Sequence, residues 1–438
     1  MPKGKRKGKF EHRRTEQPYS SDEDAGIDMT IDNMSETSGA SDLKSNHDDA
    51  ESEIQEKLEE KVLETIDALS ARSNAARASA LVALRGALQR RYLAPLLGNQ
   101  RATLADHVAR AVRRGRDAER RAAAAIAPLL ALQIGDEGTE EFTQEVRPAL
   151  AATAIDKSAS LDTRTECCSS LAVLCYLLEE DLTEILEVMR MFETIFSGSY
   201  LKGDGTVKVS GTVVEEGQWH AAAVDGWALL LTLLPPEHAD ALLHNQPPSF
   251  AKLAELLEAH SLEVRLAAGG ALAIAHEHVH GDEEEEGEGE EGAADELGAQ
   301  LRPRLEELAR DSHKYRAKRH RKLQRATFRD VLKYFEERWT PEMEVHVGGG
   351  ESVRAEGWAA RAAYGALAAA LGAGLRALAP HAPALRAALG LPPAPAARAA
   401  RLARLPRLQR HLQNNAADKA RTVARAKNRD KRSAALAI

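Results

Sequence analysis

Apolar positions along most of the chain recur at the spacing of an α-helix. Leu81, Leu84 and Leu88 follow one another at intervals of three and four residues, which places them on one helical face. Residues 182–196 likewise place leucine, isoleucine, methionine and phenylalanine on one broad face. Strand signals are scarce. The exception is the Gly-bounded, β-branched segment 206–214, which we expect to be a hairpin or a loose loop.

The helices themselves repeat. A motif of one arginine, several small residues and then an aliphatic residue begins at Arg77, Arg121, Arg164 and Arg265, at intervals of 44, 43 and 101 residues. The last interval has room for two repeats, one of them at 219–234. A period in the forties with two helices per unit is typical of HEAT and armadillo arrays. We therefore predict an all-α fold, a HEAT/armadillo-like α-solenoid with a concave binding surface, and the alternative is an irregular Ala-rich helical bundle.

The start of each repeated helix combines small residues with charges. Small side chains let neighbouring helices approach closely. An acid lies just upstream of the repeated arginine at Asp117, Asp162 and Glu263. We expect these acids to pair with the arginines that follow them.

Charge is segregated along the 438-residue chain, whose formal net charge is −8. Residues 16–60 contain 15 acids against two lysines and few large apolar side chains, which predicts disorder. Residues 281–296 contain ten acids and no base, which is typical of a solvated loop. We expect a disordered N-terminal region at 1–52 and helical repeats at 53–340, which include the acidic loop 281–296 and a basic segment 312–329. A linker at 341–352, an Ala-rich helical region at 353–403 and a basic C-terminal helix at 404–438 are expected to follow.

Several classes of protein are excluded by what the chain contains. Cys167, Cys168 and Cys175 fall within nine positions, so they cannot form a disulfide framework, and we expect buried structural thiols in a reducing compartment. The basic N-terminus has no apolar stretch behind it, which argues against a secretory signal. The apolar runs are too short to span a bilayer, so we expect a soluble intracellular protein without a membrane partner.

One motif formally suggests metal chemistry. Residues 276–280, HEHVH, match H-E-x-x-H, which can place two zinc-binding imidazoles one helical turn apart. A glycine and the acidic run follow at once, so we interpret these residues as the solvent-exposed end of a repeat helix. No phosphate-binding glycine motif or G-x-S-x-G elbow occurs either. We therefore expect no catalytic residue, metal or cofactor, and no enzyme.

Two basic segments are candidates for nucleic-acid binding. Residues 312–329 contain eight Lys and Arg and no acid, and residues 398–432 contain twelve against two Asp. As a helix, the second segment has cations over an arc of about 200°, which suits a helix surrounded by RNA phosphates. The alternative is a solvated helix with a nuclear-import role. The candidate residues are Lys314, Arg316, Lys318, Arg319, Arg321, Lys322, Arg325, Lys419, Arg421, Arg425, Lys427, Arg429, Lys431 and Arg432 for phosphates and Asn414 and Asn415 for bases or sugars.

At these segments the chain resembles the interferon-related developmental regulator family. The most specific stretches are YSSDEDAGIDMTIDNMSETSGASD at 19–42, RRAAAAIAPLLALQIG at 120–135, IFSGSYLK at 195–202, HKYRAKRHRKLQRATFRDVLKYFEER at 313–338 and RLPRLQRHLQNNAADKARTVARAKNRDKR at 404–432. The resemblance implies a non-enzymatic helical-repeat protein connected with transcriptional co-regulation and with translationally inactive ribosomes.

The resemblance also implies a role for the C-terminus. In the ribosome-bound role, the family's basic C-terminal helix enters ribosomal RNA channels, which corresponds here to residues 414–432. The chain departs from the family pattern at 281–296 and at 353–403, which puts partner contacts in those regions in doubt.

We thus expect a cytoplasmic and nuclear protein that binds ribosomal RNA, associates with inactive ribosomes and represses translation. The alternative is a nuclear transcriptional co-regulator whose solenoid groove binds a partner protein. Ser20 and Ser21 each have an acid three residues on, so they are either acidophilic kinase sites or part of an ordinary acidic tail.

Overall fold

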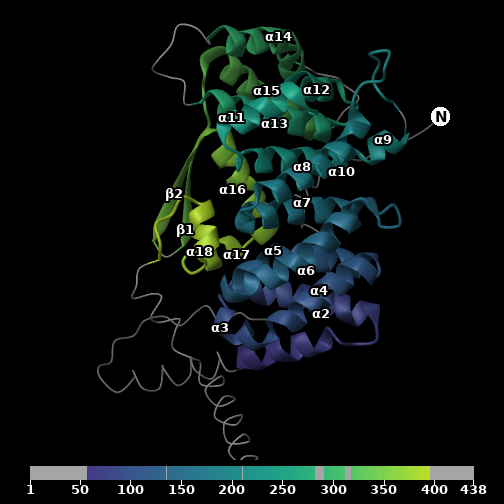
Figure 1. Ribbon diagram of the computed structural model, residues 1–438, viewed down its shortest axis with the longest axis vertical. Helices are drawn as coiled ribbons and strands as arrows, with labels where there is room; N and C mark the ends of the chain where they lie inside the picture. The colour runs from purple at the N-terminus through teal and green to yellow at the C-terminus, as the bar shows by residue number, and fades with distance from the viewer. Residues whose placement is uncertain are drawn as a thin grey trace, which may run out of the picture. The chain divides into compact units, whose positions relative to one another are not determined.

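A computed structural model describes residues 57–134, 136–209, 211–281, 291–310, 317–348 and 350–394 (Figure 1). The predictions for residues 1–52 and 404–438 lie outside this part of the chain. The repeat region begins with a helix over residues 57–68. It continues with α2 (Asn74–Arg90), α3 (Ala94–Leu97), η1 (Gly98–Gln100), α4 (Arg101–Arg114), α5 (Asp117–Ile134), α6 (Asp136–Ala154), α7 (Leu161–Leu178), α8 (Leu182–Phe196), η2 (Ser197–Ser199), α9 (Gly211–Glu215), α10 (Gly217–Leu231), α11 (Pro236–Asn245), α12 (Phe250–Glu255), η3 (Leu256–Glu258), α13 (Leu262–His280), α14 (Glu291–Arg310) and α15 (Lys318–Glu337). The C-terminal part consists of β1 (Glu342–Gly348), β2 (Glu351–Glu356), α16 (Gly357–Leu371), α17 (Gly374–Leu378) and α18 (Pro383–Ala388).

Two layers of helices form the repeat region (Figure 1). In the first layer α2, α5, α7, α10, α13 and α15 pack side by side in chain order, each against the next. In the second layer α4 packs on α5 and α6, α6 on α7, α8 on α10 and α14 on α15. First-layer helices start between 43 and 56 residues apart, and α10 occupies the interval that was expected to hold an extra repeat. The predicted α-solenoid is confirmed.

The core between the layers is filled by the periodic aliphatic side chains and a few large aromatics. Leu81, Leu84 and Leu88 are all buried, as their spacing predicts. Trp227 on α10 meets Phe196 on α8 edge to face, with ring centroids 6.4 Å apart. Burial of each such side chain stabilises the fold by about 1.5–3 kcal/mol.

A shared pattern at the helix starts joins neighbouring helices. In α2, α7 and α13 a serine side chain accepts a hydrogen bond from a first-turn backbone N–H, and these serines are Ser73, Ser160 and Ser261. One turn further on, an arginine donates to a carbonyl oxygen of the preceding element. The pairs are Arg77 to Ala71 at 2.8 Å, Arg120 to Arg113 at 2.9 Å, Arg164 to Ala154 at 3.3 Å and Arg265 to Ala259 at 2.6 Å. Because carbonyls at helix ends lack partners within the helix, each arginine fastens one element to the next. In α5 this residue is Arg120 and not the predicted Arg121.

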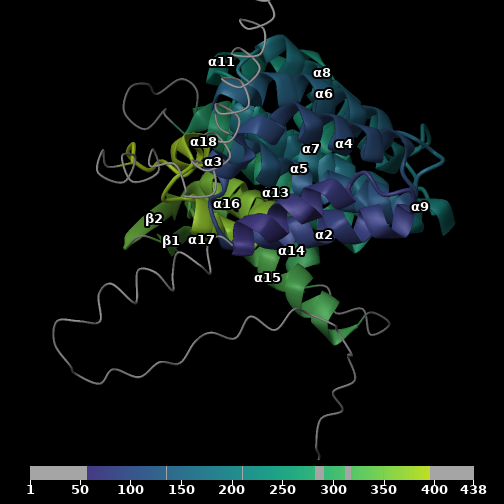
Figure 2. The ribbon, with the colours of Figure 1, turned by 90° about the horizontal axis from the view of Figure 1, so that it is seen from below.

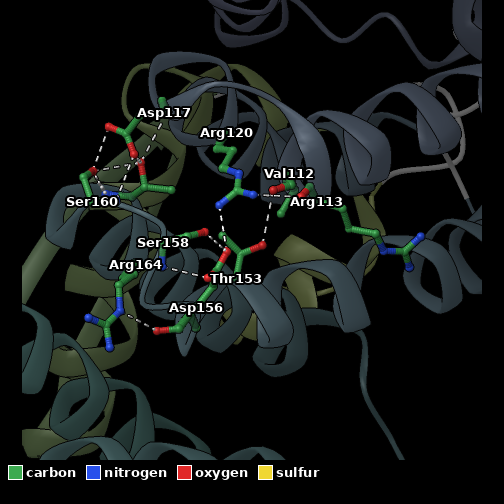
Figure 3. Close-up of polar contacts among 11 residues, drawn as sticks. Val112, Arg113, Asp117, Arg120, Thr153, Asp156, Ser158, Ser160 and Arg164 are labelled. Carbon is green, nitrogen blue, oxygen red and sulfur yellow. Dashed lines mark hydrogen bonds and ion pairs between the residues drawn. The ribbon is translucent and has the colours of Figure 1, made fainter.

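Two of the three acids upstream of these arginines act between repeats, and none forms the expected ion pair with the arginine that follows it. Asp117 of α5 accepts hydrogen bonds from Ser160 Oγ at 2.7 Å and Thr163 Oγ1 at 2.8 Å, both at the start of α7 (Figure 3). Burial raises the pKa of Asp117, but these hydrogen bonds outweigh it and hold the pKa below its usual value. Asp162 pairs with Arg121 of the preceding repeat at 3.1 Å. Glu263 instead accepts from Ser261 at 2.7 Å.

Residues 341–352 are not the predicted linker. Strands β1 and β2 form an antiparallel hairpin in which Val345 faces Val353 and Met343 faces Ala355. Polar and apolar residues alternate along both strands, which is the pattern of a half-buried strand. Residues 206–209 form the loose loop that was one of the two expectations for segment 206–214, and the end of that segment forms the short helix α9.

The C-terminal helices fold back onto the first layer. Helix α16 packs against α13, α10, α7 and α5, and α17 packs against α2. Both ends of α16 are bonded to the repeats. The Glu277 carboxylate accepts from the backbone N–H groups of Trp358 at 2.9 Å and Ala359 at 2.8 Å. At the other end Arg85 and Gln89 donate to the carbonyl oxygens of residues 370 and 371. A carboxylate at the N-terminus and an arginine at the C-terminus both suit the helix dipole.

Gly357 is required at the start of α16. Its φ is +94°, and a Cβ there would lie 2.8 Å from the Glu277 carboxylate. A side chain at this position would therefore face both backbone strain and a clash with the cap. The region predicted to be Ala-rich and helical from residue 353 becomes helical only here, because residues 353–356 belong to β2.

Candidate nucleic-acid interface

Helix α15 contains the described part of the predicted RNA-binding set. Lys318, Arg319 and Lys322 are exposed, and Arg321 and Arg325 are half-buried. Figure 2 shows one end of α15 projecting beyond the neighbouring helices. The remaining candidates lie outside the described residues: Lys314, Arg316, Asn414, Asn415, Lys419, Arg421, Arg425, Lys427, Arg429, Lys431 and Arg432.

Five cations of α15 form a narrow stripe, and the exposed Arg319 lies outside it. At 100° per residue, its members fall within an arc of about 80° and extend for about 22 Å along the helix. We define the α15 stripe as Lys318, Lys322, Arg325, Arg329 and Lys333. The opposite face, which includes Phe328 and Val331, is buried against the repeats. The sequence-based selection stopped before Arg329 and Lys333, although their helical spacing from Lys318 would have identified them.

Acidic residues do not neutralise the α15 stripe. Within the part of the chain that the structure describes, no carboxylate lies within ion-pair distance of any of its members. The acids of the same helix lie in its second half and face cations outside the stripe, Asp330 facing Arg361 at 3.8 Å and Glu336 facing Arg302 at 3.6 Å. The first turn of α15 contains no acid, so its cations also face the positive end of the helix dipole. The stripe is therefore suited to an anionic partner.

The H-E-x-x-H residues are engaged within the fold and are not the solvent-exposed helix end that the sequence suggested. His276 is fully buried, with Nδ1 2.8 Å from the Tyr334 hydroxyl. Glu277 caps α16, and His278 Nε2 lies 2.8 Å from the carbonyl oxygen of Leu234. Among the described residues, no group of three or more His, Cys, Asp or Glu side chains is arranged to hold a metal ion. The motif holds α13, α15 and α16 together.

Segment 195–202, one of the stretches that carry the family resemblance, also makes structural contacts within the fold. Ser199 Oγ lies 2.7 Å from Nδ1 of His220 on α10, and both side chains are buried. Lys208 Nζ donates to the carbonyl oxygens of Ser197 and Gly198, which fastens the following insert. Burial, and then Arg164 and Lys208, lower the pKa of His220 to about 4, so its ring is neutral at neutral pH.

The three cysteines are the buried thiols that the sequence predicted. Cys167, Cys168 and Cys175 all lie inside α7 and are free of disulfides. Burial raises the pKa of Cys168 and of Cys175 to about 12, and it raises that of Cys167 further. A thiolate is the reactive form of cysteine, so these groups are inert in the folded chain.

A third basic region was missed by the sequence reasoning. Residues 72–121 contain twelve arginines, no lysine and three acids. Most of these arginines are spread over α2, α4 and α5, and the densest group, residues 110–121, combines six arginines with two acids. A charge count over fifty-residue windows would have found them.

The expected groove of the solenoid is partly filled by the chain itself. Helices α16 and α17 pack on α13, α10, α7, α5 and α2, which belong to the first layer. A partner protein at this face would have to use the remaining surface or displace α16 and α17.

No helix among the described residues has both the length and the apolar character needed to cross a bilayer.

Comparisons with known proteins agree on one family. The family model described as "Interferon-related developmental regulator (IFRD)" matches residues 32–336, and a second, described as "Interferon-related protein conserved region", matches residues 383–433. The chain is 35% identical over 427 residues to mouse "Interferon-related developmental regulator 1" and 34% identical to the human protein of that name; both alignments cover 96% of this chain and 91% of the relative. Mouse "Interferon-related developmental regulator 2" is 34% identical over 384 residues, which cover 86% of this chain and 83% of the relative. These names describe regulators. The chain belongs to the interferon-related developmental regulator family.

Proposed function

We propose that this protein is a non-enzymatic regulator that binds ribosomal RNA, associates with translationally inactive ribosomes and represses translation. The observation that carries the proposal is the α15 stripe, five cations on one helical face with no carboxylate partner among the described residues. A narrow stripe suits a helix lying along one phosphate surface, whereas a helix inside an RNA channel needs cations on several sides. The basic segment 404–432 has the second pattern in its sequence.

The two basic segments have complementary roles in this proposal. Residues 414–432 would occupy an RNA channel, and the α15 stripe would rest on the RNA surface outside it. No reaction is needed, because a positively charged segment that fills a channel excludes other occupants. The protein would act on cytoplasmic ribosomes and also enter the nucleus.

Sedimentation of cell extract through sucrose gradients tests the proposal. We expect the full chain to migrate with non-translating ribosomes, and a truncation ending at Pro406 to remain at the top. The triple variant Lys322→Ala, Arg325→Ala, Arg329→Ala should bind more weakly, with the slope of log affinity against log salt reduced by about 2–3. A control variant removes three dispersed exposed cations, Lys61→Ala, Lys157→Ala and Arg190→Ala, and should behave as the full chain does.

Two results would count against the proposal. If the full chain stays at the top of the gradient at low salt, ribosome binding is wrong. Nuclear accumulation that is insensitive to RNase would then support the alternative, a transcriptional co-regulator. If the stripe and control variants weaken binding equally, the α15 stripe makes no specific contact.

A further inference from the structure

Two adjoining hollows lie at the α2 end of the repeats, on either side of the Arg77–Glu119 ion pair. The first has a volume of about 270 Å³ and lies between the turn after the helix at 57–68 and the end of α4. The second has a volume of about 480 Å³ and lies between the start of α2 and the start of α5. Glu119 lines both hollows, so they form one continuous surface.

Arginine dominates the charge of these hollows. The arginines that line them are Arg72, Arg77, Arg110, Arg114 and Arg116. Glu119 is the one acid in the two linings, and it accepts hydrogen bonds of 2.5 and 2.9 Å from the Arg77 guanidinium. Arg110 pairs with Asp106 on its own helix. Burial lowers the pKa of His107, the one histidine of the linings, so it adds no charge at neutral pH.

Three of these arginines lack a counter-charge. Arg72, Arg114 and Arg116 are exposed, and no carboxylate of the described residues lies within ion-pair distance of them. The chain as a whole has a net charge of −8, so this local excess of cations is not a reflection of its composition. Arg114 lines the first hollow, and Arg72 and Arg116 line the second. Like charges on these adjoining hollows repel one another, and a bound anion would relieve that repulsion.

The linings favour one class of anion. A guanidinium offers a planar fork of donors that matches the oxygens of a phosphate group. Leu69, Leu81 and Ala111 also line the first hollow and can contact an aliphatic neighbour of the phosphorylated residue. No phenylalanine, tyrosine or tryptophan lines either hollow, whereas single-stranded RNA is usually held by stacking of its bases on such rings.

We propose that these hollows form a binding site for a phosphoserine- or phosphothreonine-containing peptide segment of a partner protein. Arg72 and Arg116 contact the phosphate from the second hollow and Arg114 contacts it from the first, and the apolar residues of the first hollow contact an adjacent side chain. Dianionic phosphate with three acceptor oxygens can engage all three guanidinium groups, which a single carboxylate cannot. This site is separate from the α15 stripe, which belongs to the other end of the first layer.

Fluorescence anisotropy with the full chain tests the site. The probes are a labelled pool of short peptides with a central phosphoserine and random flanks, the same pool with serine, and a pool of short single-stranded RNA. We expect the phosphoserine pool to bind at least about tenfold more tightly than the serine pool, and Arg114→Ala with Arg116→Ala to remove that preference. Free phosphoserine should compete.

Matched variants separate this site from general attraction of anions. Arg90→Ala removes an exposed arginine of α2 outside both hollows and should leave binding within about twofold. The stripe variant Lys322→Ala, Arg325→Ala, Arg329→Ala should also retain phosphopeptide binding. The proposal is wrong if the two peptide pools bind alike, or if the stripe variant loses the preference and the Arg114/Arg116 variant keeps it. It is also wrong if the Arg114/Arg116 variant loses only the RNA pool, since the hollows would then be an RNA contact.

Discussion

Glu277 connects the repeats to the C-terminal helices, so its removal tests how α16 is held. Its carboxylate accepts two backbone hydrogen bonds, at 2.9 and 2.8 Å, from the first turn of α16. A hydrogen bond to a charged group contributes about 1.5–3 kcal/mol, and the interaction with the helix dipole adds about 0.3–1 kcal/mol. Glu277 is half-buried, so water can replace part of these interactions when its side chain is removed. We therefore expect Glu277→Ala to destabilise the attachment of α16 by the lower end of the summed range, about 3 kcal/mol.

Hydrogen exchange of the full chain, read by mass spectrometry over α16, measures this cost. A loss of about 3 kcal/mol should speed exchange in α16 roughly 100-fold, because local opening controls exchange. Glu277→Gln keeps one acceptor oxygen without the charge, and exchange should rise only about tenfold. Exchange in α4 and α6 should not change.

Glu187→Ala is the matched control, since this glutamate is exposed on α8 and has no ion pair among the described residues. If Glu277→Ala and Glu187→Ala give the same exchange in α16, the cap contributes nothing measurable. Helix α16 would then be held by the apolar contacts of Trp358, Leu367 and Leu371 and by the hydrogen bonds at its other end.

Three further predictions concern the repeats. Asp117→Ala should lower the free energy of unfolding, measured in urea, by about 1–3 kcal/mol because it removes the hydrogen-bond acceptor of Ser160 and Thr163. Asp162→Ala breaks only an exposed ion pair with Arg121 and should lower it by less than about 1 kcal/mol. His220 has a pKa of about 4 when folded against about 6.5 when unfolded, so only the unfolded chain gains its proton as the pH falls from 6.5 to 4. The contribution of His220 to stability is therefore full above pH 6.5 and declines towards pH 4. Relative to His220→Gln, the free energy of unfolding of the wild-type protein should fall by up to about 3 kcal/mol across that window. Parallel pH profiles of the two proteins would contradict this prediction. All three cysteines should resist a thiol reagent in the native protein and react after denaturation, and rapid native labelling would show that α7 is not packed as described.

The fold class could be predicted because its signals are local. Helical spacing of leucines and a period in the forties depend on residues within one or two turns and on neighbouring helices. The burial of Cys167, Cys168 and Cys175 followed from the same pattern, since they lie on an apolar helix. The hairpin at 342–356 was missed because short polar strands with three glycines between them look like a linker.

The candidate interface was predicted in part. Lys318, Arg319 and Lys322 are exposed on α15 as a basic run suggests. The extension of the stripe to Arg329 and Lys333 was missed, although their helical spacing from Lys318 indicates it. The arginines around the two hollows come from α2, α4 and the turns before α2 and α5. Up to 44 residues separate them along the chain, so the sequence does not show that they lie close together.

The repeats, the acidic and basic segments and the buried thiols are thus properties that the amino-acid sequence decides directly, because each arises from neighbours along the chain. Only the tertiary structure shows that Glu277 caps α16, that Asp117 joins two repeats, and that Arg85 holds the end of α16. The partners of Glu277 and Arg85 lie 81 and 285 residues away, respectively. Which side chains meet over such distances depends on how whole helices pack, and no local pattern encodes it.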